Sequence, residues 1–256
     1  MAVSNQATFD YLLRLGDSAL VLGQRLSEWC GKGPALEEDI ALTNVALDLI
    51  GQARMWLSYA GEVEGHGRTE DQLAYLRDVH QFRNPLLVEQ PNGSYADTLA
   101  RQFLFDTWHY YLLEALQTSS DARIAAIASK AIKEVAYHAR RSADLVVRLG
   151  DGTAESHRRM QDAIDRLWMY TGELFDSHSV DAGLVAAEVA CDPALLRAPW
   201  RQQVAEVLEE ATLTLPADGW MQPGGRGGYS GRHTEHLGFL LAEMQFLQRA
   251  YPGATW

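Results

Sequence analysis

Apolar residues recur at spacings of three and four through most of the 256-residue chain, and runs of alternating β-branched residues are nearly absent. This periodicity is typical of amphipathic helices rather than strands. The pattern therefore predicts an all-α protein. Glycine and proline breaks separate four long helices, which are expected over residues 9–29, 35–63, 95–117 and 121–149.

Shorter helices are expected between and after these four. One or two turns over residues 71–79 precede a loop over residues 85–93. The remaining helices are predicted over residues 154–175, 181–190, 198–213 and 234–250. No segment has the composition of an interdomain linker, and no short-period repeat is visible. We therefore expect a single helical domain over residues 1–256, with a four-helix bundle core and additional C-terminal helices.

Composition narrows the classes of function. The formal net charge of -12 argues against a general nucleic-acid binder or a protein that coats anionic membranes. Cys30 and Cys191 are too few for a disulfide scaffold or a cysteine zinc site. No apolar run reaches the roughly 18 residues that a membrane span needs, and the first residues lack a signal-peptide pattern. We expect a cytoplasmic protein that binds neither nucleic acid nor membrane.

Acids on the four long helices follow the layout of a di-metal carboxylate site. Such bundles place one acid on each of two helices and Glu-x-x-His on each of the other two, because residues three apart share a helical face. The acids in question are Asp17, Asp48, Asp106 and Glu134, one on each predicted long helix. Their separation is similar within each helix pair, as expected for two helix hairpins.

The two histidine slots of this layout are empty. Gly51 and Tyr137 stand where Glu-x-x-His would need histidine, although His109 and His138 lie nearby. Ordinary hydrogen-bonded or solvent-exposed helix residues are the alternative interpretation. We predict the remains of a metal site without catalytic residues or bound metal, at Asp17, Asp48, Gly51, Asp106, His109, Glu134, Tyr137 and His138.

Something must compensate the charge of buried acids if no metal does. Asp48 has apolar neighbours, so we expect it to be partly buried and to need a partner. Lys130 precedes Glu134 by four residues and shares its face, so it is a candidate to replace metal charge. A histidine cation or protonated carboxylates are alternatives, and an ordinary surface lysine is another.

Two features near the C-terminus invite a ligand. His233 and His236 in RHTEH have metal-ligand spacing, but Thr234 at a predicted helix start favours a cap. In GGRGGYSGR, Arg226 and Arg232 lie among glycines before that helix, where they could contact CoA phosphates or an acidic partner surface. The stretch lacks the spacing of an ATP-binding loop, and a plain surface loop is the alternative.

Six blocks of sequence are more specific than any of these features. They read RLGDSALVLGQRLSEWCG, LTNVALDLIGQAR, LLVEQPNGSYADTLARQ, AIKEVAYH, LWMYTGELFD and HTEHLGFLLAEMQFLQR. Together they resemble the C-subunit family of the bacterial phenylacetyl-CoA epoxidases, the phenylacetic acid degradation proteins called PaaC. The resemblance extends over nearly the whole chain.

The resemblance implies a ferritin-like bundle within a multicomponent di-iron monooxygenase that epoxidises the aromatic ring of phenylacetyl-CoA with O2 and electrons from NADPH. In that family a paralogous A subunit holds the iron and binds the CoA substrate, while a reductase subunit delivers electrons. The resemblance therefore implies a noncatalytic structural subunit in a hetero-oligomer with the A subunit and the other epoxidase subunits. It would bind no cofactor itself, and a homo-oligomer of the isolated chain is left open.

Two other functions remain as alternatives. One is an independent di-iron or di-manganese oxidase that uses Asp17, Asp48, Asp106, His109, Glu134 and His138. The other is a CoA-binding or assembly scaffold in which Arg226 and Arg232 make the contacts. The first requires bound metal in this chain, and the second requires a positively charged contact surface.

Overall fold

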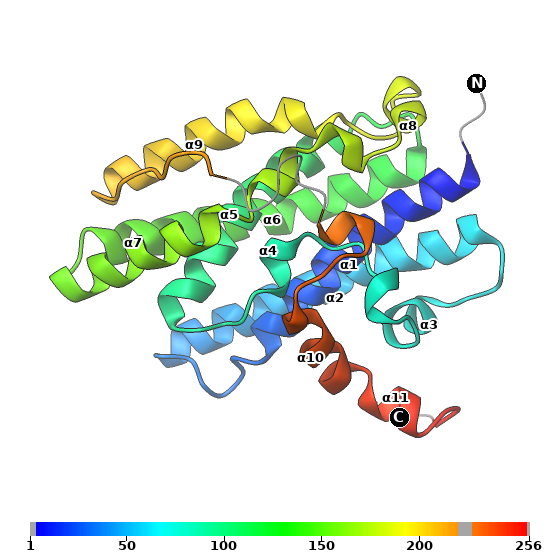
Figure 1. Ribbon diagram of the computed structural model, residues 1–256, viewed down its shortest axis with the longest axis horizontal. Helices are drawn as coiled ribbons and strands as arrows, with labels where there is room; N and C mark the ends of the chain where they lie inside the picture. The colour runs from blue at the N-terminus through cyan, green and yellow to red at the C-terminus, as the bar shows by residue number, and fades with distance from the viewer. Residues whose placement is uncertain (1–3, 220–226, 255–256) are drawn as a thin grey trace. The chain divides into compact units, whose positions relative to one another are not determined.

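The computed structural model describes residues 4–219 and 227–254. Over these residues the chain forms helices and no strand, which confirms the all-α prediction (Figure 1). None of the described helices is both long and apolar enough to cross a membrane. The chain divides into two compact units, residues 1–91 with 227–256 (unit 1) and residues 92–226 (unit 2). The single domain over residues 1–256 stays a prediction.

Unit 1 is built on an antiparallel hairpin of two long helices, α1 (Asn5–Ser27) and α2 (Leu36–Glu64) (Figure 1). The carboxylate of Asp39, in the first turn of α2, accepts hydrogen bonds from the backbone N–H groups of Gly31 and Gly33 at 3.1 and 2.8 Å. These bonds fix the short connection between the helices. At the other end, α2 stops at Gly65, which has a left-handed backbone.

Close packing of the hairpin depends on two glycines of α1 that face α2. A Cβ atom added to Gly16 would lie 2.7 Å from Cδ2 of Leu57, and one added to Gly23 would lie 3.2 Å from Cγ1 of Ile50. The inner face of α2 contributes buried apolar side chains at three- and four-residue spacing. They are Leu42, Val45, Ala46, Leu49, Ala53, Trp56 and Leu57.

Short helices complete unit 1: α3 (Glu70–Tyr75), η1 (Val79–Gln81), α4 (Leu86–Glu89), η5 (Gly228–Ser230), α10 (Glu235–Met244) and α11 (Phe246–Ala250). The predicted loop over residues 85–93 thus contains a helical turn, α4. The helix predicted over residues 234–250 is interrupted at Gln245. The side chain of Gln245 is buried and donates hydrogen bonds to the carbonyls of Ala74 and Arg77, both at 3.0 Å.

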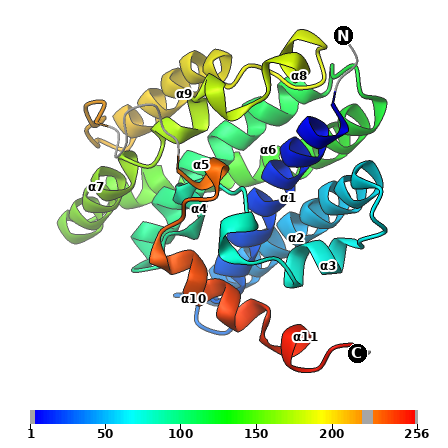
Figure 2. The same cartoon turned by 45° about the vertical axis from the view of Figure 1, so that its right-hand side comes forward.

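Unit 2 is built on a second hairpin, α5 (Tyr95–Leu116) and α6 (Ala122–Gly150), with α7 (Ala154–Trp168) and α9 (Arg197–Glu210) packed beside it (Figure 2). The two hairpins supply the four long helices that a ferritin-like bundle requires. The rest of unit 2 consists of η2 (Gly172–Phe175), η3 (Ser177–Ser179), α8 (Ala182–Ala186) and η4 (Pro193–Leu196).

Buried tryptophans hold the segments of unit 2 together. The indole N–H of Trp108 donates to the carbonyl of Leu174 at 3.2 Å, and that of Trp200 donates to the carbonyl of Leu104 at 3.0 Å. α7 ends at Trp168 rather than continuing to residue 175, because the chain turns there. The buried hydroxyl of Thr171 closes that turn on the carbonyl of Trp168 at 2.8 Å.

A buried polar cluster around Glu89 anchors the C-terminal part of unit 1. The Glu89 carboxylate accepts hydrogen bonds from the Thr234 backbone N–H at 2.6 Å and from the Asn84 amide at 3.1 Å. His233 Nδ1 lies 2.8 Å from Glu89 Oε2, and its Nε2 lies 3.1 Å from the carbonyl of Phe82. That carbonyl can only accept, so Nε2 donates and one proton is left between Nδ1 and Oε2.

Replacing Glu89 by alanine is expected to lower the free energy of unfolding by about 3 kcal/mol. The change leaves a buried histidine, amide and backbone N–H without their acceptor. Urea unfolding at neutral pH measures the loss. Glu243→Ala, at an exposed position of α10, is the control and is expected to change stability by less than about 0.5 kcal/mol. A loss of similar size in both variants would contradict the anchoring role.

Candidate functional site

Asp17 is fully buried on α1, and its negative charge is balanced by Arg77. The two guanidinium Nη groups bind both carboxylate oxygens, with Nη1 at 3.0 Å from Oδ2. The backbone N–H of Arg83 donates to the same Oδ2 at 2.8 Å. Both oxygens of Asp17 are therefore occupied by donors from the segment after α3.

Arg77 is itself held in place by its surroundings. Its Nε donates to the carbonyl of Leu73, and its Nη1 also donates to the carbonyl of Gln81 at 3.0 Å. The guanidinium lies over the ring of Phe82, with 4.3 Å to the ring centroid. A buried charge that is paired and hydrogen-bonded in this way is satisfied without a metal.

Asp106 on α5 is also buried, but its neighbours are mostly neutral. The Gln102 amide donates to Oδ1 at 2.6 Å, and the Ser142 hydroxyl lies 3.0 Å from Oδ2. Burial raises the pKa of Asp106 to about 6, while His138, Ser142, Gln102 and Arg141 act in the opposite direction. The carboxyl is therefore protonated more readily than an exposed aspartate, and below about pH 6 its neutral form can donate a proton to the Ser142 oxygen.

His109 and His138 lie in the same buried region of unit 2. Burial is the main cause that lowers the pKa of His109 to about 3, with a smaller contribution from His138. Its Nδ1 has no hydrogen-bond partner among the described residues, and its ring packs 5.2 Å from that of Phe105, centroid to centroid. Asp106 is hydrogen-bonded to Gln102 and Ser142 rather than to His109. His109 is thus a neutral core residue.

The structure corrects which positions of α2 and α6 face inward. Gly51 is exposed and Tyr137 is 45% exposed, so neither occupies an inward histidine slot. The buried stripes run one residue later, through Leu49 and Gln52 on α2, and through Val135 and His138 on α6. In this register apolar side chains fill both carboxylate slots. That the eight positions descend from a metal site stays a prediction.

The other predicted residues are less buried than Asp17 and Asp106. Asp48 is half-buried, as expected, and Glu134 is half-buried on α6. Lys130 is exposed on the same helix. The charged groups that act on the pKa of Asp106 are His138 and Arg141, and Lys130 is not among them. That Lys130 replaces metal charge beside Glu134 stays a prediction.

The RHTEH motif serves packing and hydrogen bonding. His233 is bound to Glu89, and the backbone carbonyl of His236 accepts a hydrogen bond from Arg25 at 3.3 Å. Thr234 is the N-cap residue of α10, as predicted, but its hydroxyl makes no cap hydrogen bond. Arg232 is exposed. Arg226 lies outside the described residues, so a contact of these two arginines with CoA phosphate or a partner stays a prediction.

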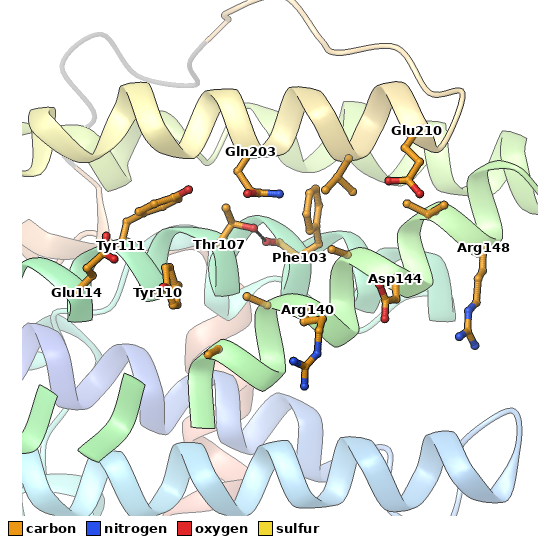
Figure 3. A pocket seen from close by; sticks show the side chains of 15 residues that line it. Phe103, Thr107, Tyr110, Tyr111, Glu114, Arg140, Asp144, Arg148, Gln203 and Glu210 are labelled. Atoms are coloured by element: carbon orange, nitrogen blue, oxygen red, sulfur yellow. Dashed lines mark hydrogen bonds between the residues drawn. The ribbon is translucent and has the colours of Figure 1, made fainter. Parts of the chain in front are cut away.

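A groove of about 940 Å³ lies on unit 2 between α5, α6 and α9 (Figure 3). Two tyrosines of α5 and several alanines of α6 line it. Its charged lining consists of three carboxylates, Glu114, Asp144 and Glu210, and two guanidinium groups, Arg140 and Arg148. The volume is within the range of ligand sites. The charges do not concentrate positive potential as the phosphates of a CoA ester would require.

The residues present do not fit a di-metal site. A carboxylate-bridged metal pair needs several oxygen and nitrogen donors free to converge. In the described part of the chain, no group of three or more histidine, cysteine, aspartate or glutamate residues is arranged to hold a metal ion. Moreover, Asp17 and Asp106 are the two buried acids of the described long helices, and their carboxylate oxygens are already hydrogen-bonded to protein groups.

The sequence did not identify four residues of the buried sites, which are Gln52, Arg77, Gln102 and Ser142. Gln102 could have been found, because it is a polar residue one turn before Asp106 within an apolar run. Gln52 could have been found from the apolar stripe of α2. Arg77 gives no such signal, since it lies 60 residues from Asp17 in a polar segment.

Comparison with known proteins defines the class of this chain. A family model described as phenylacetic acid catabolic protein matches residues 1–256. The chain therefore belongs to the phenylacetic acid catabolic protein family, which confirms the resemblance seen in the six sequence blocks. It is 54% identical over 252 residues to the C subunit of the 1,2-phenylacetyl-CoA epoxidase of Escherichia coli (strain K12). That alignment covers 98% of this chain and 100% of the relative.

Replacing Arg77 by methionine is expected to lower the free energy of unfolding by about 3–5 kcal/mol, because Asp17 then remains as an uncompensated buried charge. The double variant Asp17→Asn/Arg77→Met removes both charges and keeps an acceptor for the Arg83 N–H. It is expected to regain much of the loss. Denaturant unfolding of both variants measures the difference. A double variant less stable than Arg77→Met would contradict charge compensation.

Replacing Asp106 by asparagine is expected to make the free energy of unfolding rise more steeply with pH between about pH 4 and pH 6. In the wild type the folded chain keeps the Asp106 proton over this interval while the unfolded chain has released it. Wild-type stability from this group is therefore lost as the pH rises through its folded pKa. The shift from 3.8 to about 6 corresponds to about 3 kcal/mol at pH 7.

His109 affects the pH dependence of the free energy of unfolding in the opposite direction to Asp106, and it does so equally in the wild type and in Asp106→Asn. Its pKa is lowered in the folded chain, so its contribution to stability is lost as the pH falls below about 6.5. The comparison therefore uses the difference between the wild type and Asp106→Asn in urea unfolding from pH 4 to pH 8. Asp144→Asn, on the exposed side of α6, controls for net charge. Parallel curves for the wild type and Asp106→Asn would contradict the raised pKa.

Proposed function

We propose that this chain is the C subunit of a 1,2-phenylacetyl-CoA epoxidase and acts in phenylacetate catabolism. The observation that carries the proposal is the 54% identity to the C subunit of the Escherichia coli enzyme over the full length of that relative. The helical architecture agrees with the family.

In this proposal the subunit is structural and binds no metal or other cofactor itself. Two features support this role. Arg77 supplies the charge that neutralises Asp17, and Gln102 and Ser142 form hydrogen bonds with the two oxygens of Asp106. In addition, the inward slots that would need carboxylates hold Leu49 and Val135. The oxidase alternative would require these residues to rearrange before metal could bind.

The proposed partners follow from the same assignment. The chain pairs with the paralogous catalytic A subunit, which holds the iron, and with the other epoxidase subunits. Phenylacetyl-CoA is engaged through the complex, in the cytoplasm. A CoA contact through Arg226 and Arg232 remains a second candidate. Among the described residues, the feature in its favour is the exposure of Arg232 before the N-terminus of α10.

The proposal is tested by metal analysis of each polypeptide of the complex. The chain is co-expressed with its catalytic A subunit, the complex is purified, and the two polypeptides are separated before iron is measured. We expect a stable complex with iron in the partner alone. Stoichiometric iron in this chain would contradict the structural role, and failure to form a complex would contradict the assignment.

A matched variant separates the structural role from an oxidase. Asp106→Asn keeps the hydrogen bonds of Gln102 and Ser142 but removes the carboxylate that an oxidase would use as a ligand. We expect the iron content and the epoxidation rate of the complex to be unchanged. Loss of iron or of activity in a complex that still assembles would favour the oxidase.

A further inference from the structure

The outward face of α2 carries large apolar side chains that are exposed in the described chain. Leu36, Ile40, Leu47 and Ile50 are exposed to 72, 52, 61 and 40%. With Thr43 they follow spacings of four and three along the helix. This is the a/d pattern of a helix that packs lengthwise against another helix. Because the opposite face of α2 packs on α1, α2 has two apolar faces.

Gly51 adds a second observation on this face. It is exposed in the middle of α2, and a Cβ atom added to it would meet nothing within 4 Å. Unlike Gly16 and Gly23, it is not required for packing within the described chain. Glycine inside a helix is unfavourable relative to alanine. Its position beside the apolar stripe would let another backbone approach closely.

We propose that this face is the interface of a homodimer, in which α2 packs antiparallel against α2 of a second copy of this chain. We call the face the α2 seam, defined by Leu36, Ile40, Thr43, Leu47, Ile50 and Arg54. The proposal goes beyond the function proposed above, because it concerns how the chain associates with itself. It does not depend on iron or on the A subunit.

The second copy is favoured because the seam is complementary to itself in the antiparallel direction. A two-fold axis at the middle of the seam places Ile40 opposite Ile50 and Thr43 opposite Leu47 of the other copy. The seam spans 18 residue steps, or roughly 27 Å of helix, enough for several layers of side chains. Ile40 thus meets Ile50 of the other copy on both sides of the axis, Thr43 packs against Leu47 between these pairs, and Leu36 lies beside Arg54 at each end.

Charge decides the direction of the pairing. The first turn of α2 is acidic, with Glu37, Glu38 and Asp39. Arg54 ends the seam at the other side, and its side chain is 76% exposed. Antiparallel packing brings Arg54 of each copy beside the acidic first turn of the other. Parallel packing would place the two acidic turns together, which is unfavourable.

The existing contact of Arg54 does not oppose this arrangement. Its Nε lies 3.3 Å from Oε1 of Glu70 in the same chain. Since the arginine is mostly exposed, such a surface ion pair contributes little. Arg54 can therefore reorient toward a second copy.

Sedimentation velocity of the full chain alone, over a series of concentrations, tests the proposal. The wild type is expected to reach twice the 28.5-kDa mass of the chain. Leu47→Glu places a charge at the centre of the seam in both copies. It is expected to raise the dissociation constant of the dimer by more than about tenfold. Phe239→Glu, at a site 68% exposed on α10, is the matched control and is expected to remain dimeric.

Gly51→Ala is expected to stabilise the monomer and to weaken the dimer. The added methyl group favours the helix, so the thermal midpoint of the monomer is expected to rise by roughly 2–4 °C. The same methyl group obstructs close approach, so the dimer is expected to dissociate more readily. A variant that is stabilised and equally dimeric would contradict a role of Gly51 in the interface.

Charge exchange tests the antiparallel direction. Arg54→Glu is expected to weaken the dimer, and mixing it with a Glu37→Arg chain is expected to restore association between the two variants. A wild-type chain that stays monomeric at all concentrations would overturn the proposal, as would a dimer insensitive to Leu47→Glu. A monomeric wild type whose binding to the A subunit is lost in Leu47→Glu would assign the seam to that partner instead.

Discussion

The ion pair between Asp17 and Arg77 is the interaction on which the arrangement of unit 1 depends. A carboxylate in the middle of a buried helix must be neutralised, and here a single arginine does so while its backbone carbonyl accepts bonds from Gln245 and Arg249. One residue thus joins α1, through its side chain, to the C-terminal helices, through its backbone carbonyl. The need to satisfy one buried charge organises three regions that are distant in sequence.

Unit 2 meets the same physical constraint by a different route. Among the described residues no arginine is hydrogen-bonded to Asp106; burial raises its pKa to about 6, and Gln102 and Ser142 form hydrogen bonds with its two oxygens. Both solutions use up the oxygens that a metal would need. A helix hairpin can therefore keep an inward acid without a metal, provided that the acid is paired with a cation or hydrogen-bonded to neutral groups.

α2 shows how one helix serves two surfaces. Its inner stripe packs against the glycines of α1, while its outer stripe is exposed at a spacing suited to another helix. From its spacing of three residues after Asp48, Gly51 would be interpreted as the position of a lost histidine ligand. Its exposure makes it a surface residue instead, and its lack of a packing role within the described chain gives it a different significance.

The sequence by itself determined the helical class, the four long helices to within a few residues, and the family. Periodicity, helix stops and specific sequence blocks are local and survive without coordinates. Only the tertiary structure decided the inward residues of α2 and α6, because a shift of one residue rotates a side chain by about 100° around a helix. It also decided that Arg77 neutralises Asp17. Partners brought together across 60 residues leave no periodic trace in the sequence, since their meeting depends on the packed fold.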